Sequence, residues 1–305
     1  MTAATHFDNE PVRIIHGDIR QELSHLPDNF FDCCITSPPY WGMRDYGYEG
    51  QIGAEATIQD YIRDLVTIFR DVRRVLRGDG TLWLNIGNTY TSGGRTWRQS
   101  DSKNAGRAMS FRPDTPEGLK PKDLIGVAWM LAMALQLDGW YLRSDIIWHK
   151  PNCQPESVKD RVTMAHEYLF MLSKNEVYYF NQDAIKEPTA DGKTRKNKRS
   201  IWSINTEPCK EAHFAVFPRA LVRPCILAGS PVGGTVLDPF FGSGTVGVVA
   251  IETGRQCVGV ELKTEYVDIA RQRLFSVTPP LMPVLETPHR NAKLHEFCTN
   301  PSVAT

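Results

Sequence analysis

The sequence lacks both the cysteine spacing of a metal site and the long apolar run of a membrane span. Its seven cysteines are odd in number and form no C-x-x-C pair, which argues against a zinc site and a disulfide framework and indicates a reducing, cytoplasmic setting. No apolar run reaches the ~18 residues that cross a bilayer, and the polar N-terminus is unlike a signal peptide. The formal net charge is zero, so a nucleic-acid surface would have to come from local basic clusters.

The rest of the composition is that of a soluble globular protein. Of 305 residues, 41% are hydrophobic and 23% are charged, which is enough to bury one large core or two unequal ones. Segments with strand character alternate with segments of helical spacing, which predicts a doubly wound, mostly parallel α/β sheet. In such sheets ligands bind beyond the carboxyl ends of the strands, near the point where the strand order reverses.

The expected elements follow the apolar pattern of the sequence. Expected strands cover residues 12–16, 31–35, 81–86, 140–148, 167–172, 177–180 and 257–260, and another precedes Asp238. Expected helices cover residues 19–26, 57–76, 123–137, 218–227, 246–252 and 266–274. Segments 167–172 and 177–180 are predicted to pair with each other.

A proline-rich turn follows the apolar segment 30–35. Its residues are Thr36-Ser37-Pro38-Pro39-Tyr40, and we name it the Ser37 turn. The prolines end the strand and stiffen the chain, because proline fixes φ and has no backbone N–H. A hydroxyl, exposed carbonyls and an aromatic ring at one sheet edge suit a flat, amine-bearing heterocycle. Taken alone, the pattern is more typical of a stiff end to a strand.

A glycine-rich turn, residues 238–245, follows about 200 residues later. This Asp238 turn, Asp-Pro-Phe-Phe-Gly-Ser-Gly-Thr, connects a buried strand to a helix, and the next strand ends at Glu261. Glycines let backbone approach a ligand closely, and a carboxylate at the end of the second strand can accept both hydroxyls of a ribose. The pattern therefore predicts nucleoside binding.

The glycine spacing also matches a dinucleotide site, so a dehydrogenase is the rival interpretation. Gly242, Gly244 and Gly247 satisfy G-x-G-x-x-G, but a pyrophosphate needs a bare helix N-terminus. Here Asp238 would repel a phosphate and attract an ammonium. S-adenosylmethionine has an ammonium, a sulfonium and no phosphate, so it fits the charge pattern better.

The two turns, in this order, resemble those of the amino-group-specific DNA methyltransferases of the circularly permuted, beta-type arrangement. In that family the catalytic half precedes the cofactor half, and the resemblance runs from about Arg13 to Leu274. Further blocks that resemble the family are His149-Lys150-Pro151-Asn152, residues 155–161, His166-Glu167-Tyr168 and residues 213–218. His149 and His166 are interpreted as structural, and so are Cys33 and Cys34.

The resemblance implies a fold, a cofactor and a set of site residues. The fold is a seven-stranded sheet of the S-adenosylmethionine-dependent methyltransferase type. The implied catalytic residues are Ser37, Pro38, Pro39 and Tyr40. The implied contacts to S-adenosyl-L-methionine are Asp18, Phe217, Pro218, Asp238, Pro239, Phe240, Gly242, Ser243, Gly244, Thr245 and Glu261. No metal is implied. A helix N-cap is the alternative role for Asp18, and core packing is the alternative for Phe217 and Phe240.

The implied activity is methyl transfer to an exocyclic amine of double-stranded DNA in a prokaryotic or phage-infected cell, with a cognate restriction endonuclease as a candidate partner. Serine at the first turn position resembles the N4-cytosine enzymes, and N6-adenine enzymes with Asp or Asn there are the alternative. The target base must be flipped out of the duplex. Carbon-5 methylation of cytosine would need a nucleophilic cysteine after proline, but Cys209 and Cys225 are interpreted as packing residues.

Two interpretations from other classes remain open. An RNA or protein methyltransferase can carry a related turn, but such chains usually place the cofactor turn first. A non-catalytic DNA-binding module would keep the basic clusters and would have no use for Asp238 and Glu261 together.

The basic residues that could contact DNA phosphates lie in two segments. Arg95 and Arg98 lie in residues 89–120, which have no apolar period and are expected to form a long loop. The second segment, residues 182–210, is expected to be a small basic target-recognition unit. Its basic residues are Lys193, Arg195, Lys196, Lys198 and Arg199. Residues 11–181 and 211–276 are expected to form one catalytic and cofactor-binding domain, and 277–305 an irregular tail.

Overall fold

A mixed eight-stranded sheet is the centre of the computed structural model, which describes residues 11–43, 46–91, 113–207 and 217–277. In spatial order its strands are β1 (Val12–His16), β10 (Gln256–Glu261), β9 (Thr235–Asp238), β2 (Phe31–Thr36), β3 (Leu76–Ile86), β5 (His166–Ser173), β4 (Tyr141–His149) and β8 (Ile201–Ser203). Neighbours are parallel except at β5, which is antiparallel to β3 and β4. The predicted mostly parallel α/β sheet is confirmed, with eight strands in place of seven.

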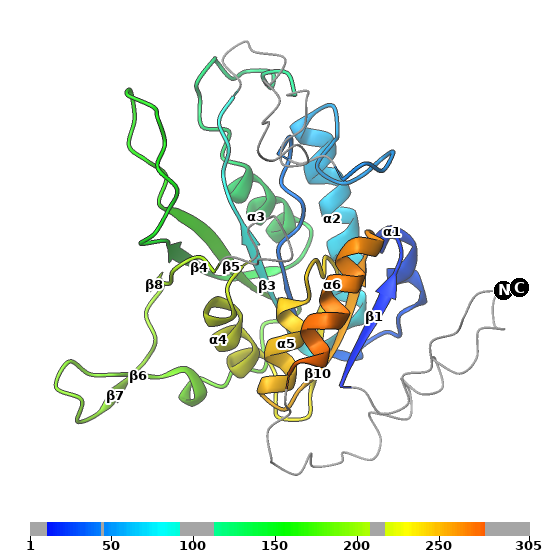
Figure 1. Cartoon of the computed structure of the whole chain (residues 1–305), viewed down its shortest axis with the longest axis vertical. Coiled ribbons are helices and arrows are strands. Elements are labelled where there is room, and N and C mark those ends of the chain that lie inside the picture. The colour runs from blue at the N-terminus through cyan, green and yellow to red at the C-terminus, as the bar shows by residue number, and fades with distance from the viewer. Residues whose placement is uncertain (1–10, 44–45, 92–112, 208–216, 278–305) are drawn as a thin grey trace, which may run out of the picture.

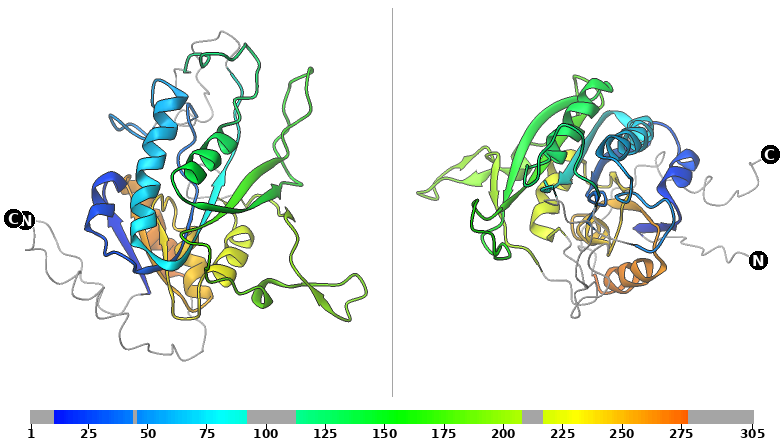
Figure 2. Two further views of the ribbon diagram at one scale, coloured as in Figure 1. Left: turned by 180° about the vertical axis from the view of Figure 1, so that it is seen from behind. Right: turned by 90° about the horizontal axis from the view of Figure 1, so that it is seen from above.

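Helices cover both faces of the sheet (Figure 1, Figure 2). One face carries α1 (Ile19–Glu22), α2 (Ile58–Val75) and α3 (Val127–Leu137), and the other carries α4 (Arg219–Gly229), α5 (Thr245–Glu252) and α6 (Thr264–Phe275). Two short 3-10 turns, η1 (Leu23–His25) and η2 (Asp183–Ile185), lie in the connections. A separate hydrophobic cluster fills each helix–sheet interface, as the alternating pattern predicts.

The longest helix, α2, shows how local sequence sets these elements. The Thr57 hydroxyl accepts a hydrogen bond of 3.1 Å from the backbone N–H of Asp60, which caps the first turn. Apolar residues then recur at helical spacing, and those on one face are buried in the core. The helix ends where Leu76 adopts an extended conformation and begins β3.

β2 is buried along its whole length because helices cover both faces of the sheet. Cys33 packs in the cluster with α4 and α5, whereas Cys34 packs in the cluster with α2 and α3, since alternate side chains of a strand point to opposite faces. Burial raises the pKa of both thiols well above the usual value. The interpretation of both cysteines as core residues is confirmed.

The predicted strand at residues 177–180 is wrong. Those residues form no strand, because β5 already pairs with β3 on one side and β4 on the other and offers no free edge. Phe180 instead stacks on Trp83, with ring centroids 6.4 Å apart.

The segment predicted to recognise the target divides into two parts. A short hairpin of β6 (Glu187–Pro188) and β7 (Arg195–Lys196) projects away from the main sheet (Figure 1). β8, which follows it, pairs with β4 at the sheet edge. The unit that stands apart from the sheet is therefore shorter than residues 182–210. Among the described residues, no helix has the length and apolarity to cross a bilayer.

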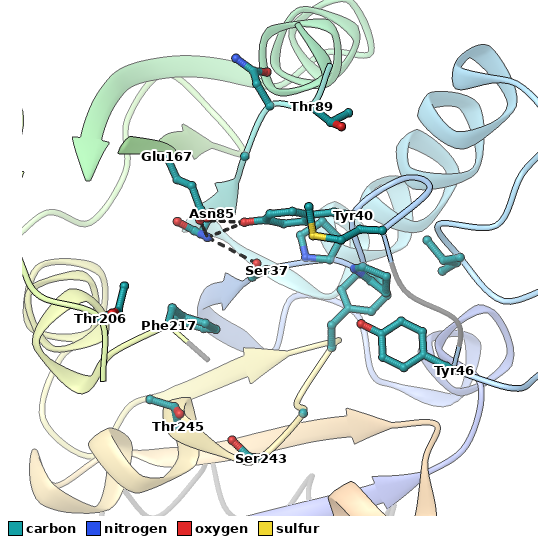
Figure 3. A pocket seen from close by; sticks show the side chains of 18 of the residues that line it. Ser37, Tyr40, Tyr46, Asn85, Thr89, Glu167, Thr206, Phe217, Ser243 and Thr245 are labelled. Atoms are coloured by element: carbon teal, nitrogen blue, oxygen red, sulfur yellow. Dashed lines mark hydrogen bonds between the residues drawn. The ribbon is translucent and has the colours of Figure 1, made fainter. Parts of the chain in front are cut away.

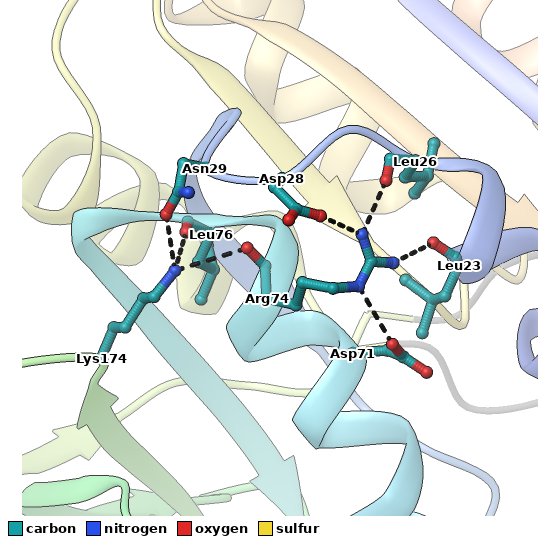
Figure 4. Close-up of polar contacts among 8 residues, drawn as sticks. All are labelled: Leu23, Leu26, Asp28, Asn29, Asp71, Arg74, Leu76 and Lys174. Carbon is teal, nitrogen blue, oxygen red and sulfur yellow. Dashed lines mark hydrogen bonds and ion pairs between the residues drawn. The ribbon is translucent and has the colours of Figure 1, made fainter.

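Two cations fix the carboxyl end of α2 to the connections around it (Figure 4). The Arg74 guanidinium donates to the carbonyl of Leu23 at 2.6 Å and to that of Leu26 at 3.0 Å. Lys174, directly after β5, donates to the carbonyl of Leu76 at 2.7 Å. These bonds add charged donors to carbonyls in the β1–β2 connection and directly after α2, and they hold that connection against α2.

Replacing Arg74 with alanine should lower the free energy of unfolding by about 2 kcal/mol, because it removes charge-assisted hydrogen bonds to partly buried carbonyls. Urea denaturation measures this loss. The matched control is Arg70→Ala, which removes a guanidinium that is exposed to solvent where it pairs with Asp138 and should have a much smaller effect. Equal losses in the two variants would contradict the role assigned to Arg74.

Candidate active site

The Ser37 turn and the Asp238 turn lie side by side at one edge of the sheet. β2 and β9 are adjacent and parallel, with Cys34 opposite Leu237, so the two turns leave the sheet next to each other. The Thr36 hydroxyl donates a hydrogen bond of 2.7 Å to Asp238 Oδ1 and so joins the turns directly. From β2 the sheet continues to β3, and from β9 it continues the other way to β10. This edge is therefore the switch point at which such sheets bind ligands.

One cavity of about 1210 Å³ opens at this edge and is lined by residues of both turns. Ser37 and Tyr40 lie toward one end of it, and Ser243 and Thr245 toward the other (Figure 3). A pocket for one small ligand typically has about 300–1,000 Å³. The cavity is therefore large enough for a cofactor and a second ligand beside it.

All four predicted catalytic residues line this cavity. The buried hydroxyl of Tyr61, on α2, donates to the carbonyl of Pro39 at 2.8 Å and anchors the Ser37 turn against the core. The Pro39 carbonyl is thus used inside the protein, whereas Ser37 and Pro38 face the space that a substrate would fill.

Three polar side chains that sequence reasoning did not assign surround Tyr40. The Tyr40 hydroxyl donates to Glu167 Oε2 at 2.8 Å. The Asn85 amide nitrogen lies 2.9 Å from the same oxygen, 3.0 Å from the Tyr40 oxygen and 3.4 Å from Ser37 Oγ. Lys150 forms an ion pair with the other oxygen of Glu167. We name Tyr40, Asn85, Lys150 and Glu167 the Glu167 network.

Part of this network could have been found in the sequence. Lys150 and Glu167 lie in blocks that resemble the methyltransferase family, and Asn85 is a polar residue near the carboxyl end of a buried strand. Their meeting depends on the antiparallel placement of β5 between β3 and β4, which the sequence pattern did not predict.

Asp238 is buried beneath its turn, with 1% of its surface exposed, and it does not line the cavity. Its Oδ1 accepts from Thr36 and, at 3.1 Å, from the backbone N–H of Phe240. Its Oδ2 is buried without a hydrogen-bond partner. Burial raises the pKa of the Asp238 carboxyl to about 7. A buried acceptor without a donor beneath the turn is what an ammonium-bearing ligand would satisfy.

Glu261 lines the cavity at the end of β10, where a ribose-binding carboxylate was predicted. Its two oxygens accept from the backbone N–H groups of Gly242 and Lys263, at 2.7 and 2.8 Å. Burial raises the pKa of the Glu261 carboxyl above its usual value, and these hydrogen bonds oppose that effect. Glu261 therefore ties β10 to the Asp238 turn, and its remaining lone pairs can accept ligand hydroxyls.

The other predicted cofactor residues divide between the cavity wall and its support. Those that line the cavity are Asp18, Phe217, Pro239, Phe240, Gly242, Ser243 and Thr245. Gly244 and Pro218 do not line it and are the N-cap residues of α5 and α4. At Gly244 φ is +79°, a conformation that favours glycine.

Asp18 caps α1 and also lines the cavity. Its carboxylate caps α1 by accepting from the backbone N–H of Arg20 at 2.9 Å, and it pairs with the Arg20 side chain. This hydrogen bonding to Arg20 lowers the pKa of Asp18, and the residue also lines the cavity.

The predicted phosphate contacts are not equivalent. Lys193, Arg195 and Arg199 are exposed on or beside the β6–β7 hairpin, and Lys196 is half-buried. Lys198 instead pairs with Glu187 at 2.7 Å and lies over the Trp202 ring, so its charge is already neutralised. Arg95 and Arg98 lie outside the described residues.

The cysteine and metal alternatives gain no support from the described residues. Cys225 is buried in α4, its thiol donates to the carbonyl of Leu221, and burial raises its pKa well above the usual value. It is therefore a packing residue, as interpreted from the sequence, while Cys209 lies outside the described residues. No group of three His, Cys, Asp or Glu side chains in the described part could hold a metal ion.

Comparison with known proteins identifies a family. The family model described as DNA methylase, of the N6/N4 methyltransferase type, matches residues 31–272. The Type II methyltransferase M.SmaI of Serratia marcescens is 66% identical over 264 residues, covering 86% of this chain and 90% of its own length. M.Cfr9I of Citrobacter freundii is 59% identical over 261 residues, covering 86% and 87%.

Solved structures agree with the fold. The PvuII DNA methyltransferase, titled cytosine-N4-specific, superposes with a TM-score of 0.67 at 19% identity, covering 95% of this chain and 92% of that one. The Thermus thermophilus protein TTHA0409, solved with S-adenosyl-L-methionine, superposes with a TM-score of 0.59 at 26% identity, covering 86% and 92%. The resemblance seen in the two turns is thereby confirmed, and the chain belongs to the N4/N6 amino-methyltransferase family of Type II DNA methyltransferases, with S-adenosyl-L-methionine as its cofactor.

Proposed function

We propose that this enzyme methylates the N4 amine of cytosine in duplex DNA. The observation that carries the proposal is the single cavity in which Ser37 and the Asp238 turn meet, joined by the hydrogen bond from Thr36 to Asp238. S-adenosyl-L-methionine supplies a methyl group on a positively charged sulfur. Glu261 and the Asp238 turn, with Asp238 itself buried beneath it, form the cofactor end of the cavity, and Ser37 and Tyr40 form the target end.

The Ser37 turn suits an amine that is a poor nucleophile. The lone pair of an exocyclic amine is delocalised into the base, so its nitrogen must become more tetrahedral before it attacks. Hydrogen bonds from the amine to Ser37 Oγ and the Pro38 carbonyl would favour that geometry, and the Tyr40 ring would stack on the base. The protein then holds the amine and the methyl group in near-attack positions, which supplies much of the rate.

The target base reaches this cavity only when it leaves the helix, at a cost of a few kcal/mol. Exposed Lys193, Arg195 and Arg199, on or beside the projecting hairpin, are suited to bind phosphates of the surrounding duplex. We place the enzyme in the cytoplasm of a bacterium or phage-infected cell, beside a cognate restriction endonuclease. The Type II relatives support that setting.

The second candidate is the N6 amine of adenine. The family model spans both amines, and the cavity has room for a purine. Ser37, where the adenine enzymes typically carry Asp or Asn, is the feature that favours cytosine.

Ser37→Ala should lower the single-turnover rate of methyl transfer at least about 100-fold, because it removes a hydrogen bond made to the amine in the transition state. Cofactor affinity, measured by calorimetry, should stay unchanged, since Ser37 lies at the target end of the cavity. If Ser37→Ala instead lost cofactor affinity and kept a normal rate at saturating cofactor, the roles assigned to the two turns would be wrong.

Cofactor affinity should rise as the pH increases through about 7, because the pKa of Asp238 is raised to about 7 and only the ionised carboxylate attracts an ammonium. Calorimetric titration over this range measures the affinity.

The raised pKa of Asp238 also affects the stability of the protein without cofactor. The contribution of Asp238 to the free energy of unfolding is greatest below the pKa that this carboxyl has in the unfolded chain, and it is lost as the pH rises through about 7.

Asp238→Asn is the matched variant, since it keeps the shape and removes the charge. It should bind the cofactor weakly at every pH, with the pH dependence abolished. Wild-type affinity in this variant would show that Asp238 makes no contact with the cofactor.

The base itself can be identified from DNA of cells that express the protein. Sequencing that distinguishes modified bases, with mass spectrometry of the nucleosides, should find N4-methylcytosine within one short recognition sequence. DNA from cells expressing Ser37→Ala is the control. N6-methyladenine in place of methylcytosine would favour the second candidate.

A further inference from the structure

The Glu167 network is built more elaborately than a stacking ring requires. A tyrosine that only stacks on a base needs no partner for its hydroxyl beyond water. Here that hydroxyl donates to Glu167, and the Glu167 carboxylate also accepts from the Asn85 amide (Figure 3). The other oxygen of Glu167 pairs with the Lys150 ammonium. Gly87 leaves the necessary space, because a Cβ there would lie 3.0 Å from the Tyr40 ring and 3.2 Å from Glu167 Cγ.

The ion pair in this network is costly as a structural element. The side chains of Lys150 and Glu167 are only 17% and 18% exposed, and desolvating two charges can outweigh their attraction. Lys150 is also held over the Trp148 ring, with Nζ 4.2 Å from its centroid. A mostly buried, charge-balanced carboxylate in the wall of an active-site cavity points to a role in the reaction.

The orientation of the Asn85 amide follows from this carboxylate. Its nitrogen must face Glu167 Oε2, since its oxygen would be repelled there, and the same nitrogen then lies within reach of the Tyr40 and Ser37 oxygens. Burial first, and then the charge of Glu167, raise the pKa of Tyr40 well above its usual value, while hydrogen bonding to Ser37 opposes this. Tyr40 therefore keeps its proton at rest, and the Asn85 amide nitrogen lies between its hydroxyl oxygen and Ser37 Oγ, at 3.0 and 3.4 Å, so that the two hydroxyls are held near each other.

We propose that Glu167 takes up the proton that the target amine loses on methylation, and that the hydroxyls of Ser37 and Tyr40 carry it there. Glu167 acts through Tyr40 and is thus a positioning residue. The inference rests on the amino-methyl transfer assigned to the Ser37 turn, and it applies equally to a cytosine or an adenine amine.

The step balances without any further reactant. The amine nitrogen bonds to the methyl carbon as the carbon–sulfur bond breaks with its electron pair left on sulfur, so the positive charge moves from sulfur to nitrogen. The nitrogen then gives a proton to Ser37 Oγ, the Ser37 proton passes to the Tyr40 oxygen, and the Tyr40 proton passes to Glu167 Oε2. Both hydroxyls are restored, and the neutral carboxyl releases its proton to solvent as the product leaves.

Tyr40→Phe is the sharpest test, because it keeps the ring for stacking and removes only the hydroxyl. Its single-turnover rate should fall about 100-fold, the lower end of what positioned proton transfer contributes, with the affinities for S-adenosyl-L-methionine and DNA unchanged. A wild-type rate in this variant would overturn the proposal, and so would a loss confined to binding.

Glu167→Gln should lower the rate to a similar extent, and the double variant with Tyr40→Phe should be no slower than the slower single variant, since residues that act as one unit are not additive. Additive losses would overturn the relay. Glu167→Gln also leaves Lys150 without its partner, so Glu167→Gln combined with Lys150→Met serves as a control. If that control recovered the wild-type rate, the defect of Glu167→Gln would come from the unpaired charge of Lys150, and the proposal would be overturned.

Product analysis of the wild type separates this inference from the proposed function. Methylated adenine would overturn the assignment of cytosine, whereas the relay is overturned only by the rates of the variants.

Discussion

The hydrogen bond from Thr36 to Asp238 joins the two halves of the site, and every other feature depends on the strand pairing that permits it. β2 and β9 are neighbours with a fixed register, in which Cys34 faces Leu237. Both strands are buried on both faces, and a slip of one residue would turn each side chain to the opposite helical layer. Packing of these two strands in the core therefore sets the position of Ser37 relative to the Asp238 turn.

The two ends of the cavity differ in their electrostatics in a way that fits two different ligands. At the cofactor end, Asp238 and Glu261 are buried carboxylates with raised pKa values, so a positively charged ligand relieves the cost of ionising them. At the target end, Lys150 balances the charge of Glu167, and a neutral base can enter. Transfer of a methyl group from a sulfonium to an amine moves positive charge from the first environment toward the second.

The sequence was sufficient for the two turns because each is a contiguous motif whose residues must lie together. The sequence pattern could not predict contacts between strands that are distant in the chain. Asn85, Lys150 and Glu167 come from three different strands or strand ends, and only the antiparallel insertion of β5 brings them around Tyr40. The same insertion explains why residues 177–180 form no strand although their composition favours one. Lys198 was predicted to contact phosphate because the sequence does not show its ion pair with Glu187, which lies on the other side of a hairpin.

A crystal structure of the enzyme with duplex DNA and a non-transferring analogue of S-adenosyl-L-methionine tests the shared cavity most directly. We predict a flipped base whose amine contacts Ser37 and Pro38, with the analogue's equivalent of the methyl group about 3–3.5 Å from that amine. An analogue bound at the Asp238 turn and a base bound in a separate pocket would contradict it.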